Sequence, residues 1–469
     1  MWSLPDAITK LFVPTSSDTQ PFLHLTLQEL NWQLNRSNAP LITAFLSPRL
    51  TKIDIAPDTS LGLASRFVDE LTGKPPIDAV SVLRAAIKMF PSSLQFLRIY
   101  LDIGPGASPT GLTEEISTFI LRSGESLREF HSNLVLSPEA VIHLWNLPNL
   151  HAWTTEQIPP PITALIHDAI PDGHTSLLPS LRSLQLWDEA ALEWLSLFDT
   201  TINSYPPQSL VADNLSHLLY THSTLVADST LLSKFIPLTN LVEITVGLQC
   251  MQQGTGCASR FSDQDVEHLA LALPKLEVLK LGEAPCSDNT CPTTILSLLF
   301  LSIHCASLRL LSVHFRTTNM AMDVMAMVDY YAHSHDLHQR PKCALGVLVA
   351  GNQIPPLEDY EFALVSMGIS TIFPSLTRIQ GSHDWGKLER LVTMCGKVQE
   401  STDLMKFLNE LRLSELSGEH LSSSLVSSPF SKVGGREFVK TFTQVFHVRN
   451  ASNAFLTRKF TPATQRMIG

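Results

Sequence analysis

The side chains of this sequence that could carry out chemistry gather first in the stretch HSHDLHQRPKC. It contains His333, His335, His338 and Cys343, and imidazole and thiolate groups are ligands that zinc prefers in proteins. Their spacing matches no standard structural zinc site, in which the ligands come as regularly spaced pairs. The spacing therefore favours a polar loop after a helix over a metal site.

A second stretch, APCSDNTCP, places Cys286 and Cys291 where they could approach one another in a loop. The 7 cysteines of the chain are scattered at uneven intervals and outline no disulfide framework. A reducing compartment, the cytoplasm or the nucleus, is therefore expected. We interpret this pair as reduced, partly buried thiols, with a regulatory disulfide as the alternative.

The sequence contains none of the common signatures of catalysis. It has no G-x-S-x-G nucleophile motif, no G-x-x-x-x-G-K-[ST] phosphate loop and no G-x-G-x-x-G dinucleotide motif. We therefore predict that the protein is not an enzyme and that it uses no cofactor and no metal.

The composition argues against two classes of partner. The formal net charge is −11 and only 16% of the residues are charged, whereas binding to nucleic acid requires clustered Lys and Arg. The longest apolar run, TILSLLFLSI at 294–303, is about half the length of a membrane span. We predict neither nucleic-acid binding nor insertion into a membrane.

Leucine accounts for 73 of the 469 residues, and much of it falls in a recurring pattern, L-x-x-[LI]-x-[LIV]. The clear copies begin at Leu50, Leu94, Leu181, Leu241, Leu276 and Leu308. The weaker copies begin at Leu127, Leu150, Leu215, Leu345 and Leu376, and an earlier one is expected near Leu25. Successive copies lie about 32 residues apart, which leaves room for one strand and one helix in each repeat.

The residues between these copies have the features of amphipathic helices. In SDQDVEHLALAL, Ser262 is a good N-cap with Asp265 three residues later, and Pro274 ends the helix. The apolar residues that form the buried face of this helix are Val266, Leu269, Ala270 and Leu273. The same scheme recurs at 137–150 and 291–308, each with a proline in the first turn, and in EAALEWLSLFDTTI at 189–202.

Alternating strands and helices at this period predict an α/β leucine-rich-repeat solenoid of about eleven degenerate repeats. We expect a curved, right-handed β/α array with a parallel sheet on the concave face. Within each strand the first, fourth and sixth residues of the pattern face the helices, and the third and fifth face outward.

Outward strand positions are the candidate contacts with a protein partner. Exposed aromatic side chains beside arginine are typical of interface hot spots, and the mixed charges favour a specific protein over a polyanion. The alternative is that long loops between the repeats cover these positions. The candidate residues are Lys52, Asp54, Phe96, Arg98, Tyr100, Gln185, Trp187, Glu243, Lys280 and Arg378.

The domain organisation follows from the extent of the repeats. Residues 21–400 form the degenerate repeats, and residues 401–421 are expected to form a C-terminal capping helix. Residues 1–20 are an N-terminal segment, and 422–469 are a Ser-rich linker with a basic tail. The tail is either a patch for an acidic partner or an end whose charge is incidental.

Two segments resemble fungal F-box/leucine-rich-repeat proteins. NAPLITAFLSPRLTKIDI (38–55) is similar to their apolar helix followed by S-P-x-L-T and a strand. Residues 261–315 are similar to their acidic helix, P-x-L-x-x-L-x-L strand, P-x-T loop and C-x-x-L-x-x-L strand. The resemblance implies a substrate receptor of a cullin-type ubiquitin ligase, whose F-box binds the ligase adaptor while the repeats select the protein substrate.

The F-box itself is not evident, and residues 1–20 are interpreted as a candidate remnant of it. LPDAITKLF (4–12) matches only its opening positions, and the residues that follow lack the expected apolar helices and tryptophan. An incomplete N-terminus would give the same pattern. Two alternatives therefore stay open: a repeat scaffold without coupling to a ligase, and, in another class, a GTPase activator built on leucine-rich repeats, for which no loop arginine or asparagine is marked.

Overall fold

The computed structural model describes most of the residues between 27 and 399. The described ranges are 27–34, 39–57, 79–101, 110–155, 180–187, 214–222, 228–248, 257–282, 291–333, 343–350, 357, 359–381 and 383–399. Within them strands and helices alternate, as the repeats predict. The segments 1–20, 189–202, 401–421 and 422–469, for which predictions are made above, lie outside the described residues.

The protein is an α/β structure with a 12-stranded sheet whose strands follow one another in chain order. All strand pairs with a defined register are parallel. The first and last strands are not neighbours in this order, so the sheet is not closed. The prediction of a repeated, solenoid-like α/β architecture with a parallel sheet is therefore confirmed.

The chain divides into two compact units, and each is described by itself. The first comprises residues 1–225 and 233–247. Its strands are β1 (Glu29–Leu34), β2 (Lys52–Pro57), β3 (Phe96–Ile99), β4 (Glu129–Ser132), β5 (Ala152–Thr155), β6 (Ser183–Trp187), β7 (His217–His222) and most of β8 (Glu243–Leu248). Its helices are η2 (Ala39–Phe45), α3 (Ala79–Lys88), α4 (Thr110–Arg122), η4 (Gly124–Ser126) and α5 (Pro138–Trp145).

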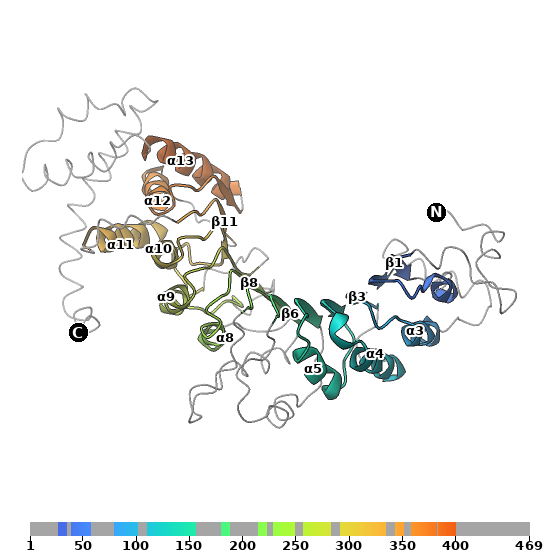
Figure 1. Cartoon of the computed structure of the whole chain (residues 1–469). Coiled ribbons are helices and arrows are strands. Elements are labelled where there is room, and N and C mark those ends of the chain that lie inside the picture. Colours follow the sequence, from blue (N-terminus) through green and yellow to red (C-terminus); the bar gives the residue numbers. More distant parts are fainter. Residues whose placement is uncertain are drawn as a thin grey trace, which may run out of the picture. The chain divides into compact units, whose positions relative to one another are not determined.

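The second unit comprises residues 226–232 and 248–469. Its strands are β9 (Val278–Leu281), β10 (Leu310–Val313), β11 (Val347–Ala350) and β12 (Arg378–Gln380). Its helices are α9 (Asp263–Ala272), α10 (Leu296–His304), α11 (Met320–His333), α12 (Asp359–Ile372) and α13 (His383–Gln399), and α8 (Ser229–Phe235) has residues in both units. Successive helices pack against one another along one side of the strands of each unit (Figure 1).

The strands have the predicted register. In the repeats that begin at Leu50, Leu94 and Leu276, the first, fourth and sixth residues are all 0% exposed. The intervening residues are half-buried or exposed. The pairing of Glu29 with Lys52 shows that the first repeat, expected near Leu25, begins at Leu27.

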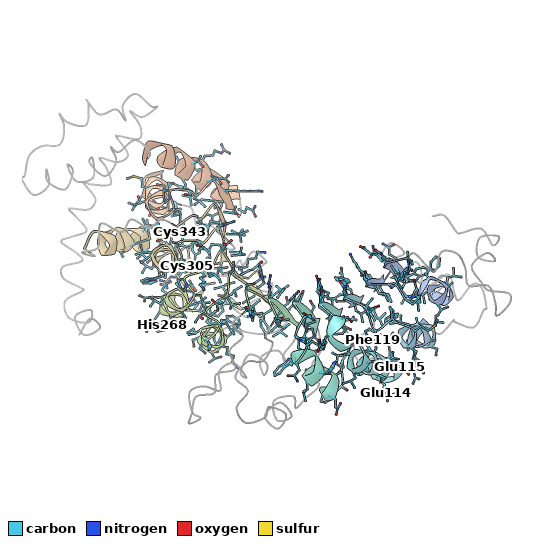
Figure 2. The ribbon with its side chains drawn as sticks, viewed as in Figure 1. Glu114, Glu115, Phe119, His268, Cys305 and Cys343 are labelled. Atoms are coloured by element: carbon cyan, nitrogen blue, oxygen red, sulfur yellow. The ribbon has the colours of Figure 1, made fainter. Side chains whose placement is uncertain are left out.

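Ion pairs between α3 and α4 support the helical layer of the first unit. The Glu115 carboxylate on α4 lies 3.1 Å from the Arg84 Nε and 3.2 Å from the Lys88 Nζ, both on α3 (Figure 2). Both basic side chains are exposed to solvent, which screens such pairs. These contacts therefore orient the two helices more than they stabilise them.

The predicted capping of α9 is confirmed in detail. The Ser262 side chain accepts a hydrogen bond from the Asp265 backbone N–H at 3.2 Å, and the Ser262 backbone N–H donates to the Asp265 carboxylate at 2.8 Å. Val266, Leu269 and Ala270 are buried on the predicted face. The capping box thus sets the first turn of the helix.

Replacing the N-cap Ser262 by Ala is expected to lower the free energy of unfolding of the second unit by about 1 kcal/mol. The substitution leaves the Asp265 N–H without its acceptor. Urea denaturation of the protein measures the change, with the exposed Gln264→Ala in the same turn as the control. Equal midpoints for the two variants would mean that the cap contributes nothing.

A proline in the first turn is confirmed for α5, where Pro138 follows the N-cap Ser137. The same prediction is wrong for Pro292, because α10 begins only at Leu296. The residues between them are tied to the preceding repeat: the Thr294 backbone N–H and hydroxyl each donate to the Asp263 carboxylate at 2.7 Å. Within the described residues, no helix combines the length and apolar character that a membrane crossing requires.

Candidate protein-interaction face

The outward residues of neighbouring strands in the first unit align in two rows across the sheet. The first row is Glu29, Lys52, Phe96, Glu129, Ala152 and Ser183. The second row is Asn31, Asp54, Arg98, His131, Thr154 and Gln185. We call these two rows, with Tyr100 just after β3, the β1–β6 face; it lies opposite the side of the sheet that α3, α4 and α5 cover (Figure 1).

Opposite charges on neighbouring strands form ion pairs across this face. The Lys52 Nζ lies 3.7 Å from a Glu29 carboxylate oxygen, and the Arg98 guanidinium lies 3.7 Å from the Asp54 carboxylate. The side chains of Lys52 and Arg98 are 37% and 47% exposed, so water screens both pairs. Each pair contributes at most about 1 kcal/mol to stability, and its main effect is on the orientation of the cations.

Aromatic rings also contact the cationic groups of Lys52 and Arg98. The Lys52 Nζ lies 5.1 Å from the centre of the Phe96 ring, and the Arg98 guanidinium lies 5.0 Å from that of Tyr100. These distances are within the range of cation–π attraction. The Phe96 ring also lies 5.5 Å from the His131 ring. The cations and rings therefore form one preformed cluster on β2, β3 and β4.

His131 connects this cluster to the next strands. Its Nδ1 lies 2.7 Å from the Thr154 hydroxyl, which donates to the Gln185 side-chain oxygen at 3.3 Å. Its Nε2 lies 3.6 Å from the Glu129 carboxylate. Burial lowers the pKa of His131 below 6.5, although the hydrogen bond and charge of Glu129 act in the opposite direction. At neutral pH the ring is therefore uncharged.

The lowered pKa of His131 predicts a stability that falls on acidification. The unfolded chain protonates this side chain near pH 6.5, whereas the folded protein does so only at lower pH. Protons therefore favour the unfolded state as the pH falls below about 6.5 toward the folded pKa. The free energy of unfolding should drop more between pH 7.5 and 5.5 for the wild type than for His131→Gln. Exposed His217→Gln is the control, and equal drops for all three proteins would contradict the prediction.

The structure brings together most of the predicted contact residues of the first unit. Lys52, Asp54, Phe96, Arg98 and Tyr100 form the cluster described above. Gln185 joins it through Thr154 and His131. The remaining predicted residues lie elsewhere: Glu243 is half-buried on β8, Lys280 and Arg378 belong to the second unit, and Trp187 ends β6 with a side chain outside the described part of the structure.

The prediction missed four residues whose side chains form ion pairs or hydrogen bonds on the face: Glu29, Glu129, His131 and Thr154. The signal for two of them is present in LREFHS, a weak copy of the pattern, in which Glu129 and His131 occupy the third and fifth positions. These positions correspond to Phe96 and Arg98 in the preceding repeat. This copy is a weak one because Ser132 stands at its sixth position, where an apolar residue is expected.

The structure describes only part of the two stretches considered for metal or thiol chemistry. His335, His338 and Cys286 lie outside the described residues. Cys343 is buried, and its thiol lies 3.7 Å from the Leu308 carbonyl oxygen. Within the ranges that the structure describes, no three metal-binding side chains come together.

Comparison with known proteins adds no relative. No family model matches the sequence, and no curated protein matches it.

Proposed function

We propose that this chain is a non-catalytic recognition scaffold of leucine-rich-repeat type that binds another protein through its β1–β6 face. The observation that carries the proposal is the cluster of partly exposed charges and half-buried rings on that face. The carboxylates and aromatic rings orient both cations of this cluster before any partner binds. The repeated α/β architecture and the 73 leucines support the assignment to leucine-rich repeats.

The charges of the face favour a protein over a nucleic acid as the partner. Lys52 and Arg98 are each paired with a carboxylate, and Glu129 adds a third acid nearby. These carboxylates would repel the phosphates of a nucleic-acid backbone. A protein surface with charges of both signs can match the pattern, and such matching selects the partner.

The side chains at the centre of the face are of the types that dominate binding energy. Phe96, Arg98 and Tyr100 belong to the aromatic and arginine class that is enriched at protein interfaces. Their mutual contacts restrict their rotamers before a partner arrives. Binding then loses less side-chain entropy, which favours affinity.

The resemblance to F-box/leucine-rich-repeat proteins supports a finer proposal, that the partner is a substrate selected for ubiquitination. On this proposal the adaptor of a cullin-type ligase binds a different part of the chain from the β1–β6 face. If the protein is instead a repeat scaffold without ligase coupling, the face still binds its partner and the adaptor does not bind.

A comparative purification tests both levels of the proposal. The tagged chain and two variants are mildly crosslinked in the cells that normally produce the protein and are then purified. Mass spectrometry identifies the proteins that co-purify with each. The first variant, Phe96→Ala with Arg98→Ala, removes the centre of the face, and the control, Arg122→Ala, removes an exposed cation on α4. We expect partners that the wild type and the control enrich alike to fall at least about tenfold with the face variant.

Equal enrichment by all three proteins would refute the role of the β1–β6 face. The adaptor gives a separate readout, because its binding should not depend on Phe96 or Arg98. Its stoichiometric recovery with the wild type and the face variant would support the ligase receptor. If the adaptor is not recovered but a partner that depends on the face is, the result would support a repeat scaffold without ligase coupling.

A further inference from the structure

Two buried cysteines from consecutive repeats face one another in the second unit. The Cys257 and Cys291 sulfur atoms are 2.7 Å apart, and the two residues are 5% and 1% exposed. Cys257 belongs to the segment that leads into α9, and Cys291 to the segment that leads into α10. The sequence suggests Cys286 as a neighbour of Cys291, but Cys286 lies outside the described residues; the structure places Cys257 beside Cys291.

Hydrogen bonds close to this thiol pair also join the segment that leads into α9 to the segment that leads into α10. The Thr293 hydroxyl donates to the Phe261 carbonyl oxygen, and Thr294 donates twice to the Asp263 carboxylate at 2.7 Å. These contacts join the same two segments a few residues beyond the cysteines. The two sulfur atoms are therefore kept together by the packing of one repeat on the next.

The other described thiols of this unit have different surroundings. The Cys305 sulfur lies 3.6 Å from the Leu273 carbonyl oxygen, and the Cys343 sulfur lies 3.7 Å from that of Leu308 (Figure 2). Burial raises the pKa of Cys305 to about 12 and that of Cys343 to about 11. Because the thiolate is the reactive form, we expect these two cysteines to be oxidised less readily, and they serve as internal controls.

We propose that Cys257 and Cys291 form an intrachain disulfide when the protein meets hydrogen peroxide, and that this bond fastens consecutive repeats together. The thiolate of one cysteine attacks the peroxide, whose O–O bond breaks, and gives a sulfenic acid and water. The second thiol then displaces the sulfenic oxygen as water and forms the S–S bond. In sum, two thiols are oxidised and one peroxide is reduced to two waters.

The bond would form from the native arrangement with little rearrangement. A disulfide sets its sulfur atoms about 2.05 Å apart, so the pair must close by well under 1 Å. The cross-link closes a loop of about 35 residues, which restricts the unfolded chain. We expect the melting temperature of the second unit to rise by roughly 5–10 °C in the peroxide-treated protein.

Peptide mapping of the full chain tests the cross-link. The purified, reduced protein is treated with hydrogen peroxide, alkylated and digested with trypsin and Asp-N, which separates Cys286 from Cys291. We expect a linked product of residues 235–260 and 288–309 that dithiothreitol resolves. It should persist in Cys250→Ser and Cys305→Ser and disappear in Cys257→Ser and Cys291→Ser.

Two outcomes would overturn the proposal. The first is a peroxide-treated wild type in which Cys257 and Cys291 stay alkylated, or in which Cys291 is linked to Cys286. Because residues 235–260 also contain Cys250 and residues 288–309 also contain Cys305, fragmentation spectra of the linked wild-type product locate the bond. This measurement holds even if a substitution at a buried cysteine impairs folding. The second is a complete Cys257–Cys291 link without a rise in melting temperature, which would refute the fastening of the repeats.

Discussion

Replacing Leu279 by Asp is expected to unfold the second unit, whereas replacing the next residue, Lys280, by Asp is expected to leave it folded. Leu279 lies on β9 opposite Leu311 of β10 and is 0% exposed. A carboxylate at this position would be buried without a partner charge, at a cost of about 5 kcal/mol or more. That cost is comparable to the whole stability of many domains, which is about 5–15 kcal/mol.

Lys280 is the matched control because it occupies the other face of the same strand. It is half-buried, and its neighbour on β10 is Ser312. We expect Lys280→Asp to change the free energy of unfolding by about 0.5 kcal/mol or less. Circular dichroism and urea denaturation measure both variants. Comparable loss of structure in both would show that the register of β9 is wrong, since a shift of one residue exchanges the two faces.

Replacing Trp385 by Ala is expected to release α13 from the end of the second unit. The Trp385 side chain is 0% exposed, and its ring meets that of Phe315 edge to face, with the ring centres 5.7 Å apart. The residue at position 381, two residues before α13, must be small, because a Cβ at Gly381 would lie 2.4 Å from a ring carbon of Trp385. Removing the indole leaves a cavity and costs about 3–5 kcal/mol.

Hydrogen exchange measures this effect directly. In Trp385→Ala, the amides of α13 should exchange much faster than in the wild type, since local opening follows the lost stability. Arg390→Ala, an exposed change on the same helix, should leave the exchange unchanged. Unaltered protection of α13 in Trp385→Ala would mean that the contacts of this helix do not depend on the tryptophan.

The sequence was sufficient to predict the register of nearly every described strand, because alternation is a local property. Successive side chains in a strand point to opposite faces, so leucines at the first, fourth and sixth positions identify the buried side without knowledge of the neighbours. Capping is equally local, and Ser262 with Asp265 marked the start of α9 correctly. Where a start depended on another repeat, as with Thr294 bound to Asp263 before α10, the local signal failed.

The candidate site was predictable residue by residue but not as a cluster. Lys52, Phe96 and Arg98 followed from their outward positions. The Phe96 ring also contacts the His131 ring, and His131 is hydrogen-bonded to Thr154. These contacts depend on which positions of separate repeats lie opposite one another. The connections between strands differ in length, so the number of residues between two strands does not predict which of their side chains come into contact.

The sequence by itself determined the repeat, the α/β class and the face to which each strand residue belongs. Only the tertiary structure decided which side chains of different repeats meet. It placed Cys257 in contact with Cys291, and it filled the space beside Gly381 with Trp385. The physical reason is that alternation arises from the geometry of one chain segment, whereas contacts between repeats arise from the packing of whole layers.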